Sequence, residues 1–310
     1  MAKIFKNNYL IVAVSGGPDS VFLLTKLMKK SNKIVVAHVN YHFRIESNQE
    51  QKFVSDFCKK NNLKFELLSV DEKMKESYLK FNKNEEAYAR LIRYDFFKNI
   101  AKKYHTNYLF LGHHKDDFLE TAIMQESRSY NYLFYGIFKK SNYQNLILIR
   151  PFVDKYWKEQ IIEKLNKKNI NYKIDQSNFS KKYLRNRIRK ELFLLSIKEK
   201  EKMFRYYFNL NRANERKRKK IEKIFTNWKK LDFDVNFFIK QKKENKDNLI
   251  YKYLSSEFID RNISINKNKI ISIISFLDNK RGDKNYRIKD NIFLKIEKQK
   301  LIIIINNFDN

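Results

Sequence analysis

Residues 8–24 read NYLIVAVSGGPDSVFLL. The segment Asn8–Val14 is dominated by an unbroken apolar run, which is typical of a strand covered on both faces. From Ser20 to Lys30 the apolar residues recur with helical spacing. The residues in between, SGGPDS, therefore lie at a strand-to-helix turn, where a loop can bind a phosphate.

Two adjacent glycines suit this turn, because they let the main chain bend tightly and approach an anion closely. The whole chain has only 5 glycines, so a pair at this point is a specific signal. The following helix would present free N–H groups and the positive end of its dipole to the anion. We predict a phosphate-binding loop made of Ser15, Gly16, Gly17, Pro18, Asp19 and Ser20. The serine hydroxyls can donate hydrogen bonds, and Asp19 can hold the Mg²⁺ that accompanies a polyphosphate.

Strand and helix patterns alternate as far as residue 150. Further strands are expected at 33–39, 63–70, 107–112 and 146–150, and helices at 48–61, 85–104 and 115–134. This alternation requires right-handed crossovers and predicts an α/β fold with a mostly parallel sheet. Later helices are expected at 155–168, 182–197, 199–230 and 263–277, with short strands at 286–289, 292–297 and 301–305. We expect a first domain at 1–197 and a smaller, basic, mainly helical domain with terminal strands at 198–310.

The chain carries 66 Lys and Arg against 35 Asp and Glu, a net charge of +31. Such an excess attracts polyanions, with nucleic acid as the first candidate partner and an anionic membrane surface as the second. The basic run Arg216–Lys220 is compatible with a solvated helix face and with contact to an RNA backbone. The apolar runs are too short for a signal peptide or a membrane span, so we expect no membrane partner. One cysteine, Cys58, excludes a disulfide framework within the chain and fits a cytoplasmic protein.

The chain contains no G-x-x-x-x-G-K-[ST] segment, which argues against a Walker-type phosphate transferase. The SGGxDS pattern instead resembles the PP-loop of the N-type ATP pyrophosphatases. This resemblance implies a Rossmann-like PP-loop ATPase domain that cuts ATP between the α and β phosphates. The loop would hold the departing pyrophosphate while the substrate becomes adenylated, with ATP and Mg²⁺ as cofactors.

Further segments are similar to motifs of the tRNA(Ile)-lysidine synthetases. They are HVNYHFR at 38–44, EAYARLIRY at 86–94, GHHKDDFLET at 112–121, RPF at 150–152, DQSN at 175–178 and RNRIR at 185–189. The resemblance covers roughly residues 8–190, and it has two departures. Tyr41, His42 and Phe43 stand where the family has H-G-L, and the glycine-rich stretch usual after Thr121 is absent.

The resemblance implies roles in nucleotide binding and adenylation for several residues. His38 would join the phosphate loop in binding ATP. Arg93 and His113 would stabilise the charge that grows on the α-phosphate, with Arg90 as the alternative arginine. A zinc site at His113 and His114 is a rival interpretation, but adjacent histidines point apart and no third histidine lies nearby in sequence.

The lysine and tRNA sites are also implied by the resemblance. Asp117 and Glu120 are three residues apart on a predicted helix, so they would point the same way and receive the cationic lysine. One of the two carboxylates would accept the proton of the attacking amine. The side chains of Arg185, Asn186 and Arg189 suit the recognition of phosphate or carboxylate groups, and they would bind the tRNA body mostly through its phosphates. A plain basic helix end is the rival interpretation.

The implied activity is ATP-dependent ligation of free L-lysine to C2 of the wobble cytidine of tRNA(Ile) with a CAU anticodon. The reaction would pass through an adenylated tRNA and release AMP and pyrophosphate. Two alternatives stay open: another PP-loop tRNA-modifying ligase, and a non-catalytic RNA-binding protein on the same fold. A single cysteine argues against a tRNA thiolase, and the basic second domain argues against an amidotransferase. The oligomeric state is left open, a homodimer being one option.

Overall fold

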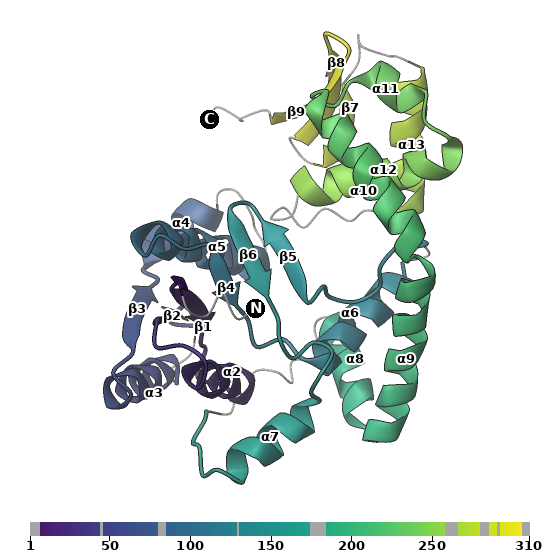
Figure 1. The fold of residues 1–310 in the computed structure, drawn as a ribbon. Helices are drawn as coiled ribbons and strands as arrows, with labels where there is room; N and C mark the ends of the chain where they lie inside the picture. Colours follow the sequence, from purple (N-terminus) through teal and green to yellow (C-terminus); the bar gives the residue numbers. More distant parts are fainter. Residues whose placement is uncertain are drawn as a thin grey trace. The chain divides into compact units, whose positions relative to one another are not determined.

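The computed structural model describes residues 7–43, 46–79, 85–128, 130–173, 184–257, 266–279, 285–289 and 292–305. The chain divides into two compact units (Figure 1). The first comprises Met1–Met124 and Gly136–Tyr207, and the second comprises Gln125–Tyr135 and Phe208–Asn310. Compactness alone does not show which segments fold independently, so the division into domains 1–197 and 198–310 stays a prediction.

A six-stranded sheet of order β3-β2-β1-β4-β6-β5 forms the centre of the first unit. Its strands are β1 (Leu10–Ala13), β2 (Ile34–Asn40), β3 (Lys64–Ser69), β4 (Tyr108–Phe110), β5 (Lys140–Tyr143) and β6 (Leu146–Ile149). All neighbours are parallel except β5, which pairs antiparallel with β6. The predicted mostly parallel α/β sheet is confirmed. Strand β5 escaped prediction because its sequence, KSNY, has no apolar run.

The helices of this unit largely follow the predicted pattern. They are α2 (Pro18–Met28), α3 (Ser47–Lys60), α4 (Glu72–Leu79), α5 (Glu85–Lys103), α6 (Lys115–Glu126), α7 (Lys158–Asn166), α8 (Leu184–Phe193) and α9 (Ile197–Ala213). Helix α4 was not predicted. The helix expected at 115–134 is wrong in length, since α6 ends at Glu126 and the chain then buries Tyr130 and Tyr132 in the core of the second unit. Tertiary packing there overrides the local pattern.

The sheet is covered on both faces because its residues alternate in direction. In β1, Leu10 and Val12 join a core cluster with residues of α2, α3 and α7. Ile11, between them, joins a second cluster with residues of α5 on the other face. The buried Cys58 belongs to the first cluster, as expected for a small core residue.

The sheet has a switch point at β1. Strand β1 pairs with β2 through Ile11 and Val35, and with β4 through Ile11 and Leu109. Strands β2 and β3 lie to one side of β1, and β4 and β6 lie to the other. The loops that follow β1 and β4 therefore diverge, and this arrangement opens a crevice at the carboxyl ends of the strands.

The second unit combines helices with a small antiparallel sheet. Its elements are α10 (Glu215–Lys230), α11 (Val235–Ile239), α12 (Lys243–Glu257), α13 (Lys267–Asp278), β7 (Tyr286–Lys289), β8 (Ile292–Glu297) and β9 (Lys300–Ile305). The three predicted terminal strands are confirmed and pair in the order β7-β8-β9. The basic stretch at 199–230 is two helices, which meet at Asn214.

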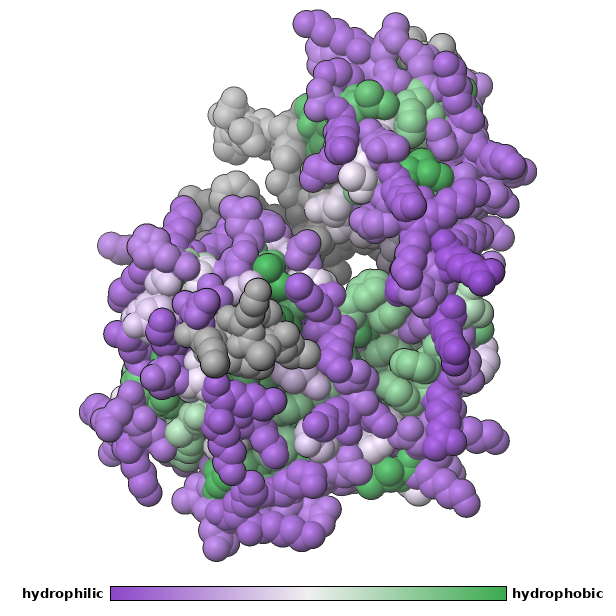
Figure 2. Space-filling model, in the orientation of Figure 1, coloured by the Kyte–Doolittle hydropathy of each residue, from purple (hydrophilic) through white to green (hydrophobic). Residues whose placement is uncertain are grey.

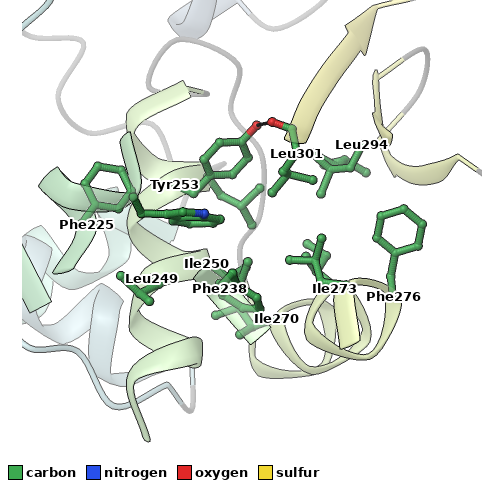
Figure 3. Close-up of a cluster of buried hydrophobic side chains, with 14 of the residues drawn as sticks. Phe225, Phe238, Leu249, Ile250, Tyr253, Ile270, Ile273, Phe276, Leu294 and Leu301 are labelled. Carbon is green, nitrogen blue, oxygen red and sulfur yellow. Dashed lines mark hydrogen bonds between the residues drawn. The ribbon is translucent and has the colours of Figure 1, made fainter. Parts of the chain in front are cut away.

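Aromatic and branched side chains from both kinds of element form the core of the second unit (Figure 3). Trp228 is fully buried at its centre, and its indole N–H donates to the Asp234 carbonyl oxygen at 2.8 Å. Hydrophilic residues cover most of the face shown in Figure 2, including the part occupied by α10 in Figure 1. None of the helices in the described part of the chain has the length and apolar character needed to cross a bilayer.

Candidate active site

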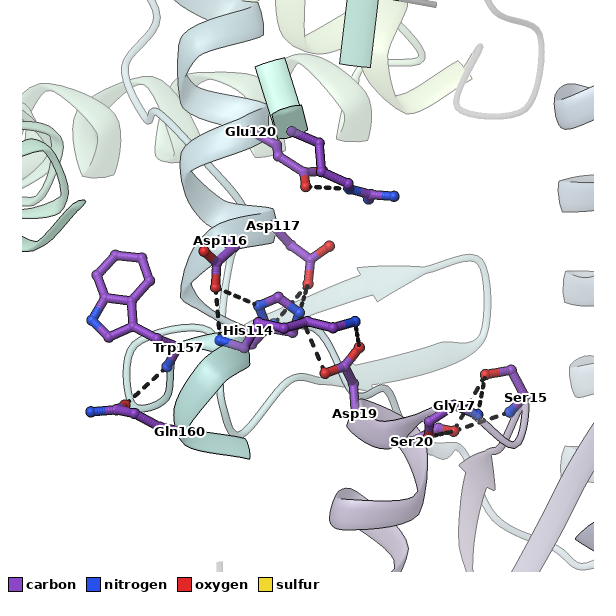
Figure 4. Close-up of polar contacts among 12 residues, drawn as sticks. Ser15, Gly17, Asp19, Ser20, His114, Asp116, Asp117, Glu120, Trp157 and Gln160 are labelled. Carbon is purple, nitrogen blue, oxygen red and sulfur yellow. Dashed lines mark hydrogen bonds and ion pairs between the residues drawn. The ribbon is translucent and has the colours of Figure 1, made fainter. Parts of the chain in front are cut away.

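The predicted phosphate loop lies between β1 and α2 and is braced from within (Figure 4). Gly16 adopts φ +96°, a conformation that favours glycine, and Gly17 caps α2 with extended backbone before Pro18. The Ser20 hydroxyl donates to the Gly17 carbonyl at 2.9 Å and accepts from the Ser15 N–H at 3.2 Å. The Gly17 N–H reaches the Ser15 Oγ at 3.4 Å. Both serines therefore fix the shape of the loop.

The loop after β4 packs directly onto the first turn of α2. A Cβ atom on Gly112 would lie 2.9 Å from the carbonyl oxygen of Asp19 and 3.1 Å from the backbone nitrogen of Ser20. Only glycine permits this approach of two backbones. The GHH segment is thereby held against the phosphate loop, as expected for adjacent parallel strands.

A cavity of about 280 Å³ opens where these two segments meet. Its lining includes seven of the residues predicted from sequence: Ser15, Gly17, Asp19, Ser20, Arg93, His113 and Asp117. Apolar walls come from residues such as Val39, Tyr41 and Phe97. The other predicted residues, Gly16, Pro18, His38, Arg90, Glu120, Arg185, Asn186 and Arg189, are not part of this lining.

A buried charged cluster lies beneath the cavity and centres on His114, which is 5% exposed (Figure 4). Its imidazole Nε2 lies 3.5 Å from Asp19 Oδ1 and 3.4 Å from Asp117 Oδ2, and its Nδ1 lies 3.1 Å from Asp116 Oδ2. Burial opposes a charge on His114, but Asp117, Asp116 and Asp19 raise its pKa well above the usual value. His114 is therefore an imidazolium surrounded by carboxylates, and two of these, Asp19 and Asp117, line the cavity.

Two carboxylates of this cluster are correspondingly acidic. Burial alone would raise the pKa of Asp19, but His114 and then Lys158 lower it to about 2. The pKa of Asp116 is likewise about 2, because His114, the backbone N–H of Lys158 and Lys200 outweigh its burial. The sequence alone did not predict that His114 and Asp116 form the centre of a charged cluster, although both lie inside the GHHKDD segment.

The cluster continues to α7 and α9 through a buried lysine. Lys200 is 1% exposed, and its Nζ binds Asp116 Oδ1 at 2.9 Å and Glu159 Oε1 at 2.6 Å. Lys158 donates its backbone N–H to Asp116 at 2.9 Å and its ammonium to Asp19 at 3.0 Å. No sequence signal marks Lys200, since it is one of many lysines in a basic region.

His113 differs from its neighbour in charge. Its side chain lines the cavity, and its Nδ1 has no hydrogen-bond partner. Burial, offset in part by Asp117, lowers the pKa of His113 to about 4, so the ring is neutral near pH 7. A neutral imidazole can donate one hydrogen bond to an anion in the cavity without carrying a charge.

The two predicted lysine ligands share Arg185, whose Nη2 lies 3.6 Å from Asp117 Oδ1, but only Asp117 lines the cavity. Asp117 lines the cavity and accepts from the backbone N–H of His114 at 2.9 Å. Glu120 is 2% exposed, and its carboxylate forms ion pairs with two arginines of α8. Arg185 Nε donates to it at 2.9 Å, and Arg189 donates at 2.7 and 3.1 Å. The same glutamate therefore holds α8 against α6.

The remaining predicted residues are placed as follows. Asn186 is half-buried on α8, between the two arginines that bind Glu120. Arg93 borders the cavity, whereas Arg90 packs over the Tyr94 ring with its guanidinium 4.8 Å from the centroid. His38 is buried, and its Nδ1–H donates to the Val14 carbonyl at 2.8 Å, bracing the strand that precedes the loop. The segment 175–178 and Arg44 lie outside the described residues.

Asp19 fits the predicted magnesium contact. Its carboxylate lines the cavity, and its buried Oδ1 makes no hydrogen bond, with the His114 Nε2 at 3.5 Å. The described residues contain no group of three or more His, Cys, Asp or Glu side chains suited to a metal ion. A divalent cation at Asp19 would therefore complete its ligands with nucleotide phosphates and water, as is usual for Mg²⁺.

Comparison with known proteins relates the chain to one family. Residues 1–195 match the PP-loop domain family. The chain is 40% identical to the tRNA(Ile)-lysidine synthase of Ureaplasma parvum over 307 residues, which are 98% of this chain and 90% of that protein. It is 39% identical to the tRNA(Ile)-lysidine synthase of Malacoplasma penetrans over 305 residues, which are 97% of this chain and 99% of that protein.

A solved structure supports the fold. The U34-tRNA thiolase NcsA from Methanococcus maripaludis is similar with a TM-score of 0.52 and 16% sequence identity. The match covers 68% of this chain and 74% of that chain. At this identity the likeness concerns the fold alone.

Proposed function

This chain belongs to the PP-loop family and, within it, to the tRNA(Ile)-lysidine synthases, and from this premise we propose how its residues carry out the reaction. It is an ATP-dependent ligase that modifies tRNA. The substrate tRNA is the isoleucine tRNA with a CAU anticodon, and the amine is free L-lysine. The wobble cytidine must leave its stack to enter the cavity. The observation that carries this proposal is the single cavity that joins the phosphate loop to the GHH segment.

The first step is adenylation of the cytidine. Its O2 attacks the α-phosphorus of ATP, the α–β bond breaks and pyrophosphate leaves. The loop Ser15–Ser20 and the free N–H groups of α2 hold the departing pyrophosphate. Mg²⁺ on Asp19 would offset the charge of the phosphates when it is bound. Arg93 and neutral His113 face the same cavity, and we assign them to the α-phosphate.

The second step transfers lysine. The ε-amine attacks C2 of the activated cytidine, the C2–O bond breaks and AMP leaves. Free lysine is mostly an ammonium ion at neutral pH, since its usual pKa is about 10.4. Asp117 supplies a carboxylate inside the cavity that binds this cation and accepts the proton that the nitrogen must lose before it can attack.

Glu120 contributes in another way in our proposal. Its charge is already balanced by Arg185 and Arg189, so binding lysine would require their release. We assign Glu120 to the positioning of these two arginines, which together with Asn186 contact phosphates of the anticodon arm. The basic second domain, including Arg216–Lys220, contacts the body of the tRNA through its backbone.

A labelled-lysine assay tests the function. Purified protein is incubated with tRNA(Ile) transcript, ATP and labelled lysine, and label on the tRNA is the expected result. Nucleoside mass analysis then locates the modification at the wobble position. Absence of label, with pyrophosphate still released, would favour another PP-loop ligase. Binding of tRNA with neither label nor pyrophosphate would favour a non-catalytic RNA-binding protein.

The division of roles has a separate test. Asp117→Asn keeps an oxygen that accepts from the His114 N–H but removes the charge that binds lysine. We expect AMP transfer to tRNA to persist while the KM for lysine rises at least tenfold. Glu191→Gln is the matched control, because this carboxylate is exposed and pairs only loosely, at 3.8 Å, with Arg187. An equal loss of both steps in Asp117→Asn would contradict the assignment.

A further inference from the structure

An aromatic pair follows β2 at the edge of the cavity. Tyr41 lines the cavity, and Phe43 lies two residues further along with 48% of its surface exposed. The two rings are stacked, with centroids 5.2 Å apart and planes only 12° from parallel. The buried ring of Tyr88 meets Phe43 edge-on, with centroids 6.1 Å apart and planes at 89°. Phe43 is thus held in place while part of its surface stays open to solvent.

The backbone that carries this pair is fixed by hydrogen bonds. The Tyr41 hydroxyl donates to the Ala89 carbonyl on α5 at 2.8 Å. The buried Asn40 accepts from the His42 N–H at 2.9 Å and donates to two side chains of α3. His42 adopts φ +54°, and its Nε2 lies 2.6 Å from Ser69 Oγ. These internal hydrogen bonds restrict the turn, and a restricted turn lowers the entropy cost of binding.

The chemistry around Phe43 suits a nucleotide. A rigid aromatic ring that is open to solvent is the group on which RNA-binding proteins stack unpaired bases. The ammonium of Lys75 lies over the Phe43 ring, 5.9 Å from its centroid, so an arriving base would displace it towards the phosphate of the same nucleotide. Its partner Glu72 is largely exposed and 3.3 Å away, so that ion pair is weak and easily exchanged.

We propose that Phe43 is a stacking platform for a base of the tRNA anticodon loop that neighbours the base entering the cavity. This inference rests on the proposed function. The adenine of ATP is the other base available, but Phe43 is not part of the cavity lining, where a nucleotide held by the phosphate loop must lie. The platform would make binding depend on an unpaired loop, since a paired base cannot present its face to the ring.

Kinetics of three variants test the platform. Stacking on an aromatic side chain contributes about 1–3 kcal/mol per base, so Phe43→Leu should raise the KM for tRNA roughly 5- to 150-fold. The KM for ATP and the KM for lysine should change less than twofold. Phe43→Trp should keep the KM for tRNA near that of the wild type, and Phe43→Ala should resemble Phe43→Leu. Phe193→Leu is the matched control, as this phenylalanine is 74% exposed on α8.

A binding measurement distinguishes failure of the platform from failure of the proposed function. Transcripts carry 2-aminopurine at each position flanking the wobble nucleotide, and fluorescence is measured without ATP or lysine. Quenching by the wild type and by Phe43→Trp, but not by Phe43→Leu, is the expected result, whether or not lysine is transferred. The proposal would be overturned if Phe43→Leu left the KM for tRNA unchanged, or if it raised the KM for ATP instead of the KM for tRNA. So would a Phe43→Trp variant as weak as Phe43→Leu at equal thermal stability.

Discussion

A single methyl group on Gly112 should displace the phosphate loop. In Gly112→Ala the new Cβ would lie 2.9 Å from the carbonyl oxygen of Asp19, 3.0 Å from its carbonyl carbon and 3.1 Å from the nitrogen of Ser20. Carbon atoms in contact prefer about 3.5–4.0 Å, so the two backbones must separate by roughly 0.5–1 Å. All three neighbours are backbone atoms, which cannot swing away as a side chain can.

The expected loss follows from the cost of misplacing reactive groups. A shift of about 1 Å costs about 100-fold in rate, so we expect kcat/KM for ATP to fall roughly 10- to 100-fold. This corresponds to about 1.4–2.7 kcal/mol of transition-state stabilisation. The assay is tRNA-dependent release of pyrophosphate at varied ATP, with thermal unfolding measured in parallel.

Gly136→Ala is the control for a general loss of stability. Gly136 has φ +86°, and an added Cβ would collide with the Phe118 ring, but no atom of the phosphate loop is involved. This variant should unfold at a lower temperature and keep its KM for ATP below the unfolding transition. Wild-type ATP kinetics in Gly112→Ala, or the same kinetic loss in both variants, would refute the reasoning.

Three further predictions concern the charged groups. Lys200→Met removes the ammonium that pairs with Asp116 and Glu159. Asp116 keeps His114 as a partner and Glu159 is 44% exposed, so the free energy of unfolding in urea should fall by about 1–3 kcal/mol. The exposed Lys202→Met should change it by less than about 0.5 kcal/mol, and equal effects would contradict a stabilising role of the buried pair. Arg93→Lys should slow pyrophosphate release at least about tenfold, as expected for loss of a group that stabilises transition-state charge. Arg90→Lys should leave the rate of pyrophosphate release unchanged. If Arg90→Lys slowed the release and Arg93→Lys did not, the adenylation role would belong to Arg90. The pKa of Asp116 is lowered to about 2 from 3.8, so its contribution to stability is complete above about pH 4 and is lost as the pH falls towards 2. Urea titrations between pH 5 and 2 should show a shallower decline for Asp116→Asn, and parallel declines would count against the pKa shift.

The phosphate loop and the GHH segment could be placed from sequence because each is contiguous and follows a buried strand. Local patterns were enough to place Asp19 and Asp117 each directly after a buried strand, but the pairing of these two strands, β1 and β4, came from the structure. The structure places both in the lining of one cavity.

The ion pairs between helices that are far apart in the sequence could not be predicted from the sequence alone. Lys200 and Asp116 are 84 residues apart, and Arg189 and Glu120 are 69 residues apart. Such pairs depend on how helices pack, and an apolar period does not report which charged residue turns inward. The predicted length of α6 was wrong for a related reason. Tyr130 is buried in the core of the second unit, and the local pattern does not reveal that core.

The two serines of the phosphate loop have a consequence for how ATP binds. Their hydroxyls make hydrogen bonds within the loop, with Ser20 donating to Gly17. An arriving triphosphate must therefore exchange existing bonds for new ones, so calorimetry should report little net enthalpy from these side chains. The same hydrogen bonds tie Ser15 to Ser20, so a phosphate that takes the hydroxyl of one serine also affects the other.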